Sequence, residues 1–519
     1  MAGSPSDVTY SEFPLQKPCR TKIIATVGPA CEQEEMLREL ILAGVDLFRI
    51  NFAHNNISDA GELVRRIRKV SAALEQPIGI LADLAGPKMR LGELPGGTFD
   101  CQNGMIIEFV REDDAKAKRN PGTFTTTCDR LIEDLQIGNR VLLADGTIIL
   151  EVQEKTPEHL LCRVVQGGTV RSHQGVNVPG APLSVDTLQK ADIENAIWAT
   201  EAGIDFIGFS FVRTAGDVID LRKILCRAAR EKLGDARWNE IPKEEQGNYY
   251  PNIIVKIEKP EVLDHLDEIV TLSDGVMIAR GDSGVETDIA RIAMVQKQII
   301  ETCRRLVKPV IVATQMLESM TGETIPTRAE ATDVANAILD GADACMLSGE
   351  TAIGRYPVQA VKMMNRIAEE TEKTFAKRMS GPDGRTSAQG SEKAPLPPAV
   401  QVSLAVCDVA GRLADMISAA MILVSTRTGR TARNLSNQRN FVMTVGTTSC
   451  EAVLRRMSLY WGVLPIGNTP ADPMAMLINI VERARKAGYI KNGERVVLIS
   501  GIGTLQNNQN AIYVHQTEP

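Results

Sequence analysis

The sequence contains no C-x-x-C motif, and its ten cysteines are scattered along the chain, the closest two being Cys19 and Cys31. This spacing argues against a disulfide framework and against a thiolate metal site, and it is typical of a protein in a reducing compartment. Because the chain has only five histidines, a histidine-rich metal centre is not expected either.

The chain also lacks long apolar segments and any tract of positive charge. No run approaches about 18 apolar residues, the length that would cross a bilayer, and the polar segment up to Pro18 has no apolar signal core. The 58 basic and 65 acidic residues leave a formal net charge of −7, which argues against nucleic acid or an anionic membrane as the main partner. We therefore expect a cytoplasmic protein that holds anionic ligands with local cationic groups.

At 519 residues the chain is long enough for more than one domain. Its first two-thirds contains eight short apolar runs, each followed sooner or later by a segment with helical periodicity. This alternation predicts an α/β fold, a (β/α)8 barrel with its helices outside and its chemistry where the strands end. The eight runs are Lys22–Val27, Asp46–Ile50, Ile78–Leu84, Asp205–Ser210, Ile253–Ile257, Gly275–Ala279, Pro309–Ala313 and Asp343–Leu347.

Two changes of composition divide the chain. After Arg90 come short β-like runs separated by Asn-Gly, Asp-Gly and Gly-Gly turns, which predict a small all-β domain inserted above the active face. Its position is that of a lid, with a passive decoration as the alternative. A later stretch rich in Gly, Ser and Pro predicts a linker to a separate α/β domain. The predicted boundaries are 1–88 and 185–377 for the barrel, 89–184 for the lid, 378–398 for the linker and 399–519 for the C-terminal domain.

Residues 232–251 lengthen the connection before the fifth predicted strand. The segment is charged, contains aromatic residues and has no clear periodicity. The sequence indicates no function for it.

Charged residues at strand ends are the candidate catalytic groups. Lys256 and Glu258 lie two residues apart, so strand alternation places them on one face. A charged pair that faces into a barrel is costly unless it binds something. Asp282 follows the next strand, and Glu258 and Asp282 would be neighbouring oxygen donors for a hard cation such as Mg²⁺. A set of structural ion pairs is the alternative interpretation.

Other strand ends offer anion-binding and hydroxyl groups. Backbone N–H groups from Gly281 onward can bind a carboxylate or phosphate at the start of a helix. The hydroxyls of Thr314 and Ser348 suit proton relay, although capping is the commoner role of such residues. Arg49 and Arg90 follow the second and third strands and suit phosphoryl oxygens. A cation, two arginines, a lysine and a hydroxyl together fit phosphoryl transfer.

The segments that carry these residues resemble the pyruvate kinase family, and the likeness extends over essentially the whole chain. The family fold, a (β/α)8 barrel with an inserted β lid and a C-terminal α/β domain, matches the predicted organisation. The segments that carry the resemblance are Thr21–Pro29 (TKIIATVGP), Phe48–His54 (FRINFAH), Ala82–Arg90 (ADLAGPKMR), Gly175–Gly180 (GVNVPG), Lys256–Glu258 (KIE), Ile278–Glu286 (IARGDSGVE), Lys308–Met320 (KPVIVATQMLESM), Pro326–Asp340 (PTRAEATDVANAILD) and Met346–Glu350 (MLSGE).

The resemblance implies the last reaction of glycolysis, phosphoenolpyruvate + ADP → pyruvate + ATP. It implies that Glu258 and Asp282 bind Mg²⁺ or Mn²⁺ and that Lys256 stabilises the migrating phosphoryl group. The resemblance also implies that Gly281, Asp282 and Thr314 hold the substrate carboxylate and that Arg49 contacts the phosphoryl group. Asn51, His54 and Arg90 are implied to lie on the nucleotide side. Thr314 and Ser348 are implied to protonate the enolate, with Glu350 orienting them.

The chain departs from the family at the monovalent-cation region, which comprises Asn51, Asp83, Leu84 and Lys88. Relatives commonly have Ser, a K⁺ ligand, at the position of Ala53, and those that need K⁺ usually have Glu at the position of Lys88. The Lys88 ammonium could supply the missing positive charge, so we expect activity that does not require K⁺. Ser283 stands where relatives usually have Leu. Gln174 stands where relatives often have a Lys that contacts the nucleotide, and the loss of that charge could weaken ADP binding by about 1.5–3 kcal/mol.

The C-terminal domain contains a candidate effector loop between a strand and a helix. Its hydroxyls, glycine and helix N-terminus could cradle a phosphate, and relatives use this loop for sugar-phosphate effectors. An unoccupied turn is the alternative, because Gly501–Asn510 departs from the family pattern. Relatives are usually tetramers, so a homotetramer is expected. The loop residues are Ser425, Thr426, Arg427, Thr428, Gly429, Arg430 and Thr431.

Two other functions remain open at this point. An Mg²⁺-dependent barrel lyase or aldolase acting on pyruvate-like substrates would explain Glu258 and Asp282, but not the lid, Arg90 or Lys256. A catalytically silent regulatory relative would retain the fold, but the presence of Thr314 with the lysine and both carboxylates argues against it.

Overall fold

The structure, a computed structural model, describes most of the chain. The described residues are 19–111, 120–128, 130–144, 146–181, 184, 186–281, 289–379, 398–470, 472–500 and 511–518.

The predicted fold class is confirmed. Within the described residues, eight parallel strands close a barrel in the order β1-β16-β15-β14-β13-β12-β3-β2. Each of the eight apolar runs in the sequence contributes one of these strands, with small differences at the ends. The barrel strands are β1 (Lys22–Thr26), β2 (Leu47–Asn51), β3 (Gly79–Asp83), β12 (Phe206–Phe209), β13 (Asn252–Ile257), β14 (Gly275–Ala279), β15 (Val310–Ala313) and β16 (Ala344–Leu347).

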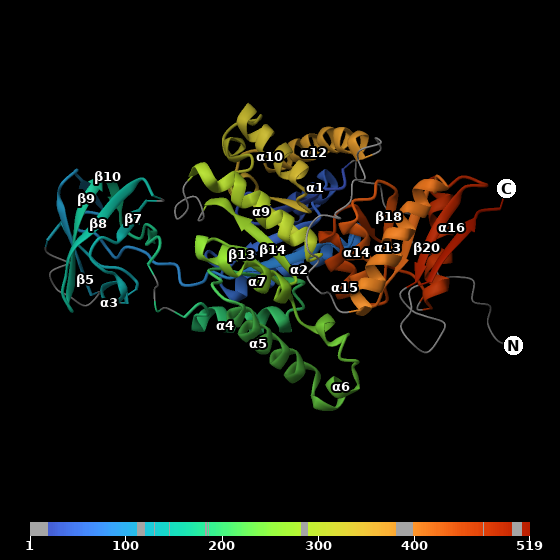
Figure 1. The fold of residues 1–519 in the computed structure, drawn as a ribbon, viewed down its shortest axis with the longest axis horizontal. Coiled ribbons are helices and arrows are strands. Elements are labelled where there is room, and N and C mark those ends of the chain that lie inside the picture. Colours follow the sequence, from blue (N-terminus) through green and yellow to red (C-terminus); the bar gives the residue numbers. More distant parts are fainter. Residues whose placement is uncertain are drawn as a thin grey trace.

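Helices surround the barrel (Figure 1). Alternate strand residues point outward and pack against these helices, which gives the large apolar core between the two layers. The main outer helices are α1 (Glu34–Ala43), α2 (Ile57–Ala73), α4 (Lys190–Glu201), α5 (Ala215–Leu233), α7 (Leu266–Leu272), α9 (Ile292–Arg305), α10 (Arg328–Asp340) and α12 (Pro357–Met379), with short α11 (Gly349–Ala352) and 3₁₀ turns η2 (Pro260–His265), η3 (Ile289–Arg291) and η4 (Glu318–Thr321).

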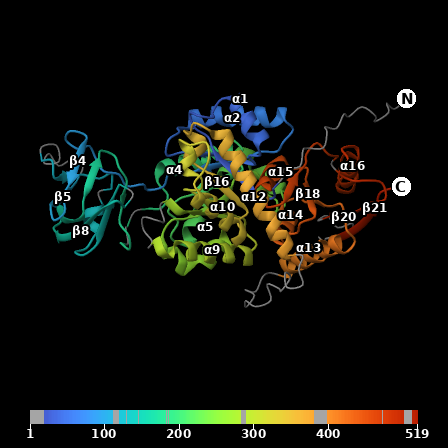
Figure 2. The ribbon, with the colours of Figure 1, turned by 90° about the horizontal axis from the view of Figure 1, so that it is seen from above.

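An inserted β domain follows β3 and forms a lobe beside the barrel (Figures 1 and 2). It has a six-stranded and a two-stranded sheet. Four of its strands, Thr98–Cys101, Thr123–Phe124, Gly168–Arg171 and Val176–Asn177, were not expected, because these short segments show no clear apolar alternation. The elements are β4 (Thr98–Cys101), β5 (Ile106–Val110), β6 (Thr123–Phe124), α3 (Arg130–Asp134), β7 (Arg140–Leu143), β8 (Ile148–Lys155), β9 (His159–Gln166), β10 (Gly168–Arg171) and β11 (Val176–Asn177).

The C-terminal domain is a five-stranded sheet with helices, at the opposite end of the molecule from the inserted β domain (Figure 2). The predicted linker falls almost entirely outside the described residues, between the end of α12 and the start of α13. The elements are α13 (Pro398–Met416), β17 (Met421–Ser425), α14 (Arg430–Asn437), β18 (Met443–Thr447), α15 (Glu451–Arg456), η5 (Met457–Leu459), β19 (Val463–Pro465), α16 (Pro473–Lys486), β20 (Arg495–Ser500) and β21 (Ala511–Gln516).

The segment 232–251 contains regular structure that the sequence did not indicate. It holds α6 (Asp235–Glu240) and the 3₁₀ turn η1 (Gln246–Tyr249). Neither element is long enough to show an amphipathic period. No helix among the described residues is both long and apolar enough to span a membrane.

The C-terminal domain packs against the amino ends of the barrel strands. Lys22 Nζ donates to the carbonyl of Val463 at 2.8 Å, and the hydroxyl of Ser458 donates to the carbonyl of Pro77 at 2.6 Å. The apolar cluster inside the barrel continues into this domain through Leu459 and Tyr460. The amino end of the barrel is therefore covered, which leaves chemistry to the carboxyl end.

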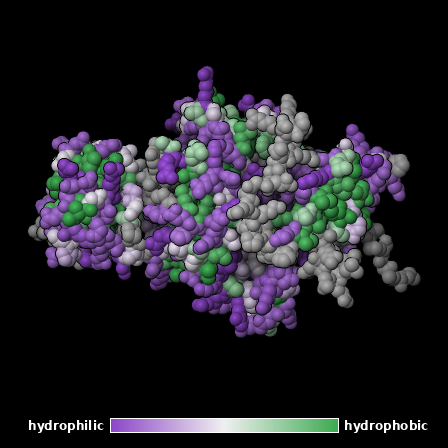
Figure 3. Space-filling model, in the orientation of Figure 1, coloured by the Kyte–Doolittle hydropathy of each residue, from purple (hydrophilic) through white to green (hydrophobic). Residues whose placement is uncertain are grey.

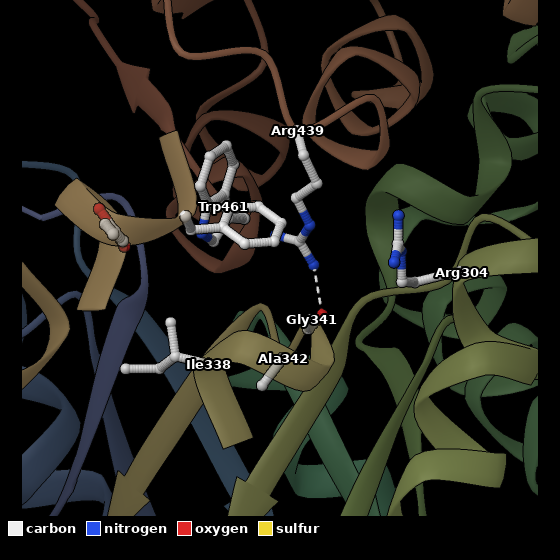
Figure 4. A pocket seen from close by; sticks show the side chains of 8 residues that line it. Arg304, Ile338, Gly341, Ala342, Arg439 and Trp461 are labelled. Atoms are coloured by element: carbon white, nitrogen blue, oxygen red, sulfur yellow. Dashed lines mark hydrogen bonds between the residues drawn. The ribbon is translucent and has the colours of Figure 1, made fainter. Parts of the chain in front are cut away.

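A buried arginine fixes this junction (Figure 4). The Arg439 guanidinium donates to the carbonyl of Gly341 at 2.5 Å, lies 3.2 Å from the carboxylate of Asp343 and stacks over the ring of Trp461 at 4.9 Å. The side chains of Arg439 and Asp343 are only 3% and 8% exposed. A buried ion pair of this kind is destabilising to break, because the remaining charge is left without compensation.

We expect Arg439→Met to destabilise the protein by about 3–5 kcal/mol, since it leaves Asp343 buried and unpaired. The matched control is Arg65→Met, which removes a surface arginine that is 63% exposed and pairs with Glu62, and it should leave the midpoint of unfolding nearly unchanged because exposed ion pairs contribute little to stability. Urea-induced unfolding followed by circular dichroism measures both. Equal midpoints for the two variants would contradict the role of Arg439.

Candidate active site

Strand alternation directs a group of charged side chains into the carboxyl end of the barrel. Leu47, Leu81 and Ile254 belong to the apolar cluster inside the barrel, whereas their strand neighbours pack outward against the helices. The residues two positions further along the same strands, Arg49, Asp83 and Lys256, therefore face inward above this apolar layer. The sequence predicted an inward-facing lysine at this position, and the structure shows which side chains contact it.

Lys256 is held between two carboxylates. Its ammonium lies 2.8 Å from Glu258 Oε1 and 3.4 Å from Asp83 Oδ1, and it donates to the hydroxyl of Ser210 at 2.8 Å. Burial alone would lower the pKa of this lysine, but the two carboxylates outweigh burial, so the pKa of Lys256 lies above its ordinary value. The side chain is therefore a fixed and buried positive charge.

Asp83 joins Lys256 to Arg49. The Arg49 guanidinium approaches Asp83 Oδ2 with Nε at 2.8 Å and Nη2 at 2.5 Å, and donates through Nη1 to the hydroxyl of Thr26 at 3.2 Å. Burial raises the pKa of a carboxyl, but Lys256 and Arg49 outweigh it and hold the pKa of Asp83 below its usual range. Gly208 makes room for this carboxylate, because a Cβ there would lie 2.7 Å from Asp83 Oδ1.

Glu258 is oriented by strained backbone. Its Oε2 accepts the N–H of Phe211 at 2.9 Å, and Phe211 has a φ of 56°, which is unfavourable for a bulky residue. Gly86 packs against the same ring, where a Cβ would lie only 2.6 Å from Phe211 Cδ2. Strain of this kind persists where the surrounding structure demands it, and it occurs preferentially at functional sites.

A second strained turn follows β15. Thr314 and Gln315 have φ values of 66° and 52°, which is exceptional for a β-branched residue such as Thr. The Thr314 hydroxyl donates to the carbonyl of Ala313 at 2.6 Å and accepts the N–H of Gly281 at 2.7 Å. Arg280 secures the turn by donating to the Thr314 carbonyl at 2.9 Å. Thr314 and Gly281, two of the residues implied to hold the substrate carboxylate, are thus in direct contact.

Glu350 connects the ends of β15 and β16. It is fully buried, and its carboxylate accepts the N–H of Leu317 at 3.0 Å and that of Ser348 at 2.7 Å. Burial raises the pKa of Glu350. The Ser348 hydroxyl is buried and has no hydrogen-bond partner among the residues that the structure describes. This arrangement fits the orienting role implied for Glu350.

The residues implied to bind the nucleotide and the monovalent cation range from exposed to buried. His54 and Lys88 are exposed, and the Lys88 ammonium makes no ion pair with any described residue. Asn51 Oδ1 accepts the N–H of Ala53 at 3.1 Å. Arg90 donates to the carbonyl of His173 in the inserted β domain at 3.1 Å, so it lies at the connection between that domain and the barrel. Leu84 is buried beside Asp83.

The donor chemistry at the carboxyl end fits Mg²⁺. Carboxylate oxygens from one or two residues suffice for this ion, since waters and substrate phosphates complete its shell, and Glu258 supplies such oxygens. The other predicted ligand, Asp282, and the neighbouring Ser283 lie outside the described residues. No cluster of three or more His, Cys, Asp or Glu residues that could hold a metal occurs within the described parts of the chain.

The candidate effector loop is tied to the barrel. The Thr426 hydroxyl accepts the N–H of Gly429 at 3.1 Å, and Gly429 has a φ of 78°. The exposed Arg427 pairs with Glu245 at 3.2 Å, and its carbonyl accepts from the Asn248 amide at 3.1 Å. Both partners belong to the segment 232–251. The loop Gly501–Asn510 lies outside the described residues.

The sequence did not identify every residue of the site. Ser210 is the last residue of a predicted barrel strand. Its position at a strand end could have identified it as a residue of the site and a partner of Lys256. Asp83 was assigned to the monovalent-cation region, and its ion pairs with Lys256 and Arg49 were not foreseen. Asp333, which pairs with Arg280 at 2.6 Å, gives no signal in the sequence, because α10 brings it there through tertiary packing.

Comparisons with known proteins agree with this geometry. Residues 18–361 match the model of the pyruvate kinase barrel domain, and residues 404–515 match that of the pyruvate kinase alpha/beta domain. The chain is 38% identical to a pyruvate kinase of Agrobacterium vitis over 96% of this chain and 98% of the relative. It is 36% identical to a pyruvate kinase of Clostridium acetobutylicum over 93% of this chain and 96% of the relative.

A solved structure extends the likeness to three dimensions. The crystal structure of a pyruvate kinase from Cryptosporidium parvum superimposes with a TM-score of 0.82 at 31% sequence identity, covering 96% of each chain. Two family models that together span most of the sequence, relatives above 35% identity and a matching fold all agree. The chain belongs to the pyruvate kinase family.

Proposed function

We propose that the carboxyl end of the barrel is where this chain transfers the phosphoryl group of phosphoenolpyruvate to ADP, and that the transfer depends on Mg²⁺ or Mn²⁺ bound by Glu258 and Asp282. The observation that carries this proposal is the buried Lys256 ammonium between Glu258 and Asp83. Such a charge is costly to bury, and it faces the one end of the barrel that the C-terminal domain does not cover.

Each side chain has a definite part in the proposed reaction. When bound, the divalent cation would neutralise charge on the phosphoryl oxygens and bridge them to the protein. Lys256 stabilises the phosphoryl group as it moves, and Arg49 orients its oxygens with guanidinium N–H groups not needed for Asp83. The N–H groups at Gly281 and Asp282, with the Thr314 hydroxyl, hold the substrate carboxylate, which requires the bonds from Gly281 N–H to Thr314 and from the Thr314 hydroxyl to Ala313 to open. Asn51, His54 and Arg90 face the nucleotide.

The second half of the reaction needs a proton at the enolate carbon. We assign its delivery to the hydroxyls of Thr314 and Ser348, through water. The Ser348 hydroxyl is buried and not committed to a described partner, and Glu350 fixes the backbone beside it. A hydroxyl held in this way can relay a proton without becoming a stable base itself.

A turnover assay separates this proposal from the two alternatives. The purified full chain should form pyruvate from phosphoenolpyruvate only when ADP and Mg²⁺ are both present. Release of pyruvate without ADP would indicate a lyase, and no turnover at all would indicate a silent relative.

Activity is expected to be independent of K⁺. Ala53 supplies no hydroxyl ligand, and we propose that Lys88, exposed and unpaired among the described residues, takes the place of the monovalent cation when substrates bind. The same kcat is expected in K⁺ and in tetramethylammonium at equal ionic strength. The double variant Ala53→Ser, Lys88→Glu should become K⁺-dependent. Strong activation of the unmodified protein by K⁺ would overturn this assignment.

We further propose that the protein is a cytoplasmic homotetramer. We also propose that the loop Ser425–Thr431 binds a phosphorylated effector. Support for assembly comes from α13, where Val402, Val409 and Met416 are 59%, 53% and 82% exposed at a seven-residue spacing. Figure 3 shows an apolar surface over this part of the C-terminal domain. An exposed apolar stripe on a helix is typical of an interface. Light scattering tests the tetramer, and titration with sugar phosphates tests the effector.

A further inference from the structure

A groove on the outside of the barrel lies between α5, α6, α7 and the segment that follows α6. Its volume is about 500 Å³, which is in the range of small-molecule sites. It is separate from the strand ends that form the candidate active site, and neither the sequence motifs nor the proposed function uses it.

Four cationic side chains line the groove, and one of them is not paired with a described carboxylate. Arg222, Lys223, Arg227 and Arg230 line it from one face of α5, and no acidic residue is among its described lining residues. Three of the four cations have carboxylate partners, at 3.0 Å for Arg222, 2.8 Å for Lys223 and 2.5 Å for Arg230. Arg227 is exposed and makes no hydrogen bond or ion pair with a described residue, so its guanidinium is available to an anion.

The remaining walls are apolar and aromatic. Ile219 and Leu272 are 41% and 37% exposed at the groove, Tyr250 is half-buried, and Trp238 is buried at 6% exposure beneath this lining. Exposed aliphatic side chains next to aromatic rings offer contact to a flat apolar body. The groove therefore combines one open guanidinium with a surface for a ring.

The aromatic walls are held in place by the C-terminal domain. Arg456 is 5% exposed and donates to the carbonyls of Gly247 at 2.8 Å and Tyr250 at 2.6 Å. These bonds fix the end of the segment 232–251, whose beginning carries Trp238. A preformed wall lowers the entropic cost of binding a ligand.

We propose that this groove binds a phosphate monoester that carries an aromatic ring, the chemistry of a nucleoside monophosphate. Arg227 pairs with the phosphate in fork geometry, and the ring lies against the exposed Ile219 and Leu272 and the half-buried Tyr250. The site gives the segment 232–251 a role. It does not depend on the catalytic assignment, because it shares no residue with the candidate active site.

Alkylation of Cys226 provides a local test. This cysteine lines the groove and is partly exposed. The full-length protein is treated with N-ethylmaleimide, and each cysteine is followed by peptide mass spectrometry. Phenyl phosphate should slow modification of Cys226 in a saturable way, whereas phenol and inorganic phosphate should each protect at much higher concentration. Cys128 and Cys450, also partly exposed, serve as internal controls and should be unaffected.

Two variants decide whether protection comes from the groove itself. Arg227→Gln should weaken protection about tenfold or more, because the charge-assisted fork pairing with the phosphate is lost, with unchanged turnover. Arg38→Gln, which alters an exposed arginine on α1, should protect like the unmodified protein. Absence of protection by phenyl phosphate, equal protection by inorganic phosphate, or full protection in Arg227→Gln would each overturn the proposal.

Discussion

Replacing Lys256 by Met is expected to lower kcat by about 10²–10³-fold or more and to change the KM for phosphoenolpyruvate much less. The ammonium is buried and fixed by Glu258, Asp83 and Ser210, so it is preorganised for charge that develops on the phosphoryl group during transfer. Methionine keeps an unbranched side chain that reaches the Cε position of lysine, but it lacks the ammonium group and its charge. Steady-state kinetics with a coupled assay measures both constants.

Lys256→Met also removes the positive charge between the carboxylates of Glu258 and Asp83, which destabilises the fold. A loss of catalytic activity must therefore be distinguished from a loss of folded protein. Lys256→Arg keeps the charge and should retain the fold while misplacing the donor. Lys190→Met removes a lysine that is 92% exposed and should change neither kcat nor KM. If Lys256→Met kept near-normal turnover in a folded protein, the role of the lysine would be refuted.

Glu258→Gln is expected to abolish most divalent-cation binding and to lower turnover by a similar order, about 10²-fold or more. The amide keeps the shape of the side chain and its bond to the Phe211 N–H, but it removes the negative charge that a hard cation requires. Binding of Mn²⁺, followed by electron paramagnetic resonance, reports the loss without reference to activity.

The matched control for this variant is Glu261→Gln, an exposed carboxylate at the start of η2. It should bind Mn²⁺ like the unmodified protein. Undiminished Mn²⁺ affinity in Glu258→Gln would show that the cation has other ligands, and the assignment of Glu258 would be wrong.

The barrel was predictable because its strands are buried on both sides. Parallel strands of this kind appear as short continuous apolar runs, as in Ile253–Ile257, and each of the eight runs overlaps a barrel strand. The inserted β domain was harder, because strands such as Thr123–Phe124 are only two residues long. Helix α6 is likewise a local element that tertiary contacts stabilise.

The site was predictable only in part. Alternation along β13 placed Lys256 and Glu258 on one face, and the structure has their charged atoms 2.8 Å apart. Contacts between different strands cannot be obtained from spacing. The pairing of Lys256 with Asp83, the space that Gly208 leaves for that carboxylate and the strained turn at Thr314 all depend on barrel closure.

The most direct test of the account measures ATP and pyruvate together, in the unmodified protein and in Lys256→Met. For the unmodified protein we predict one ATP for each pyruvate, with both products requiring ADP and Mg²⁺, and for the variant a loss of both products in parallel. Pyruvate formed in excess of ATP, or a variant that makes both at the normal rate, would contradict phosphoryl transfer at this lysine.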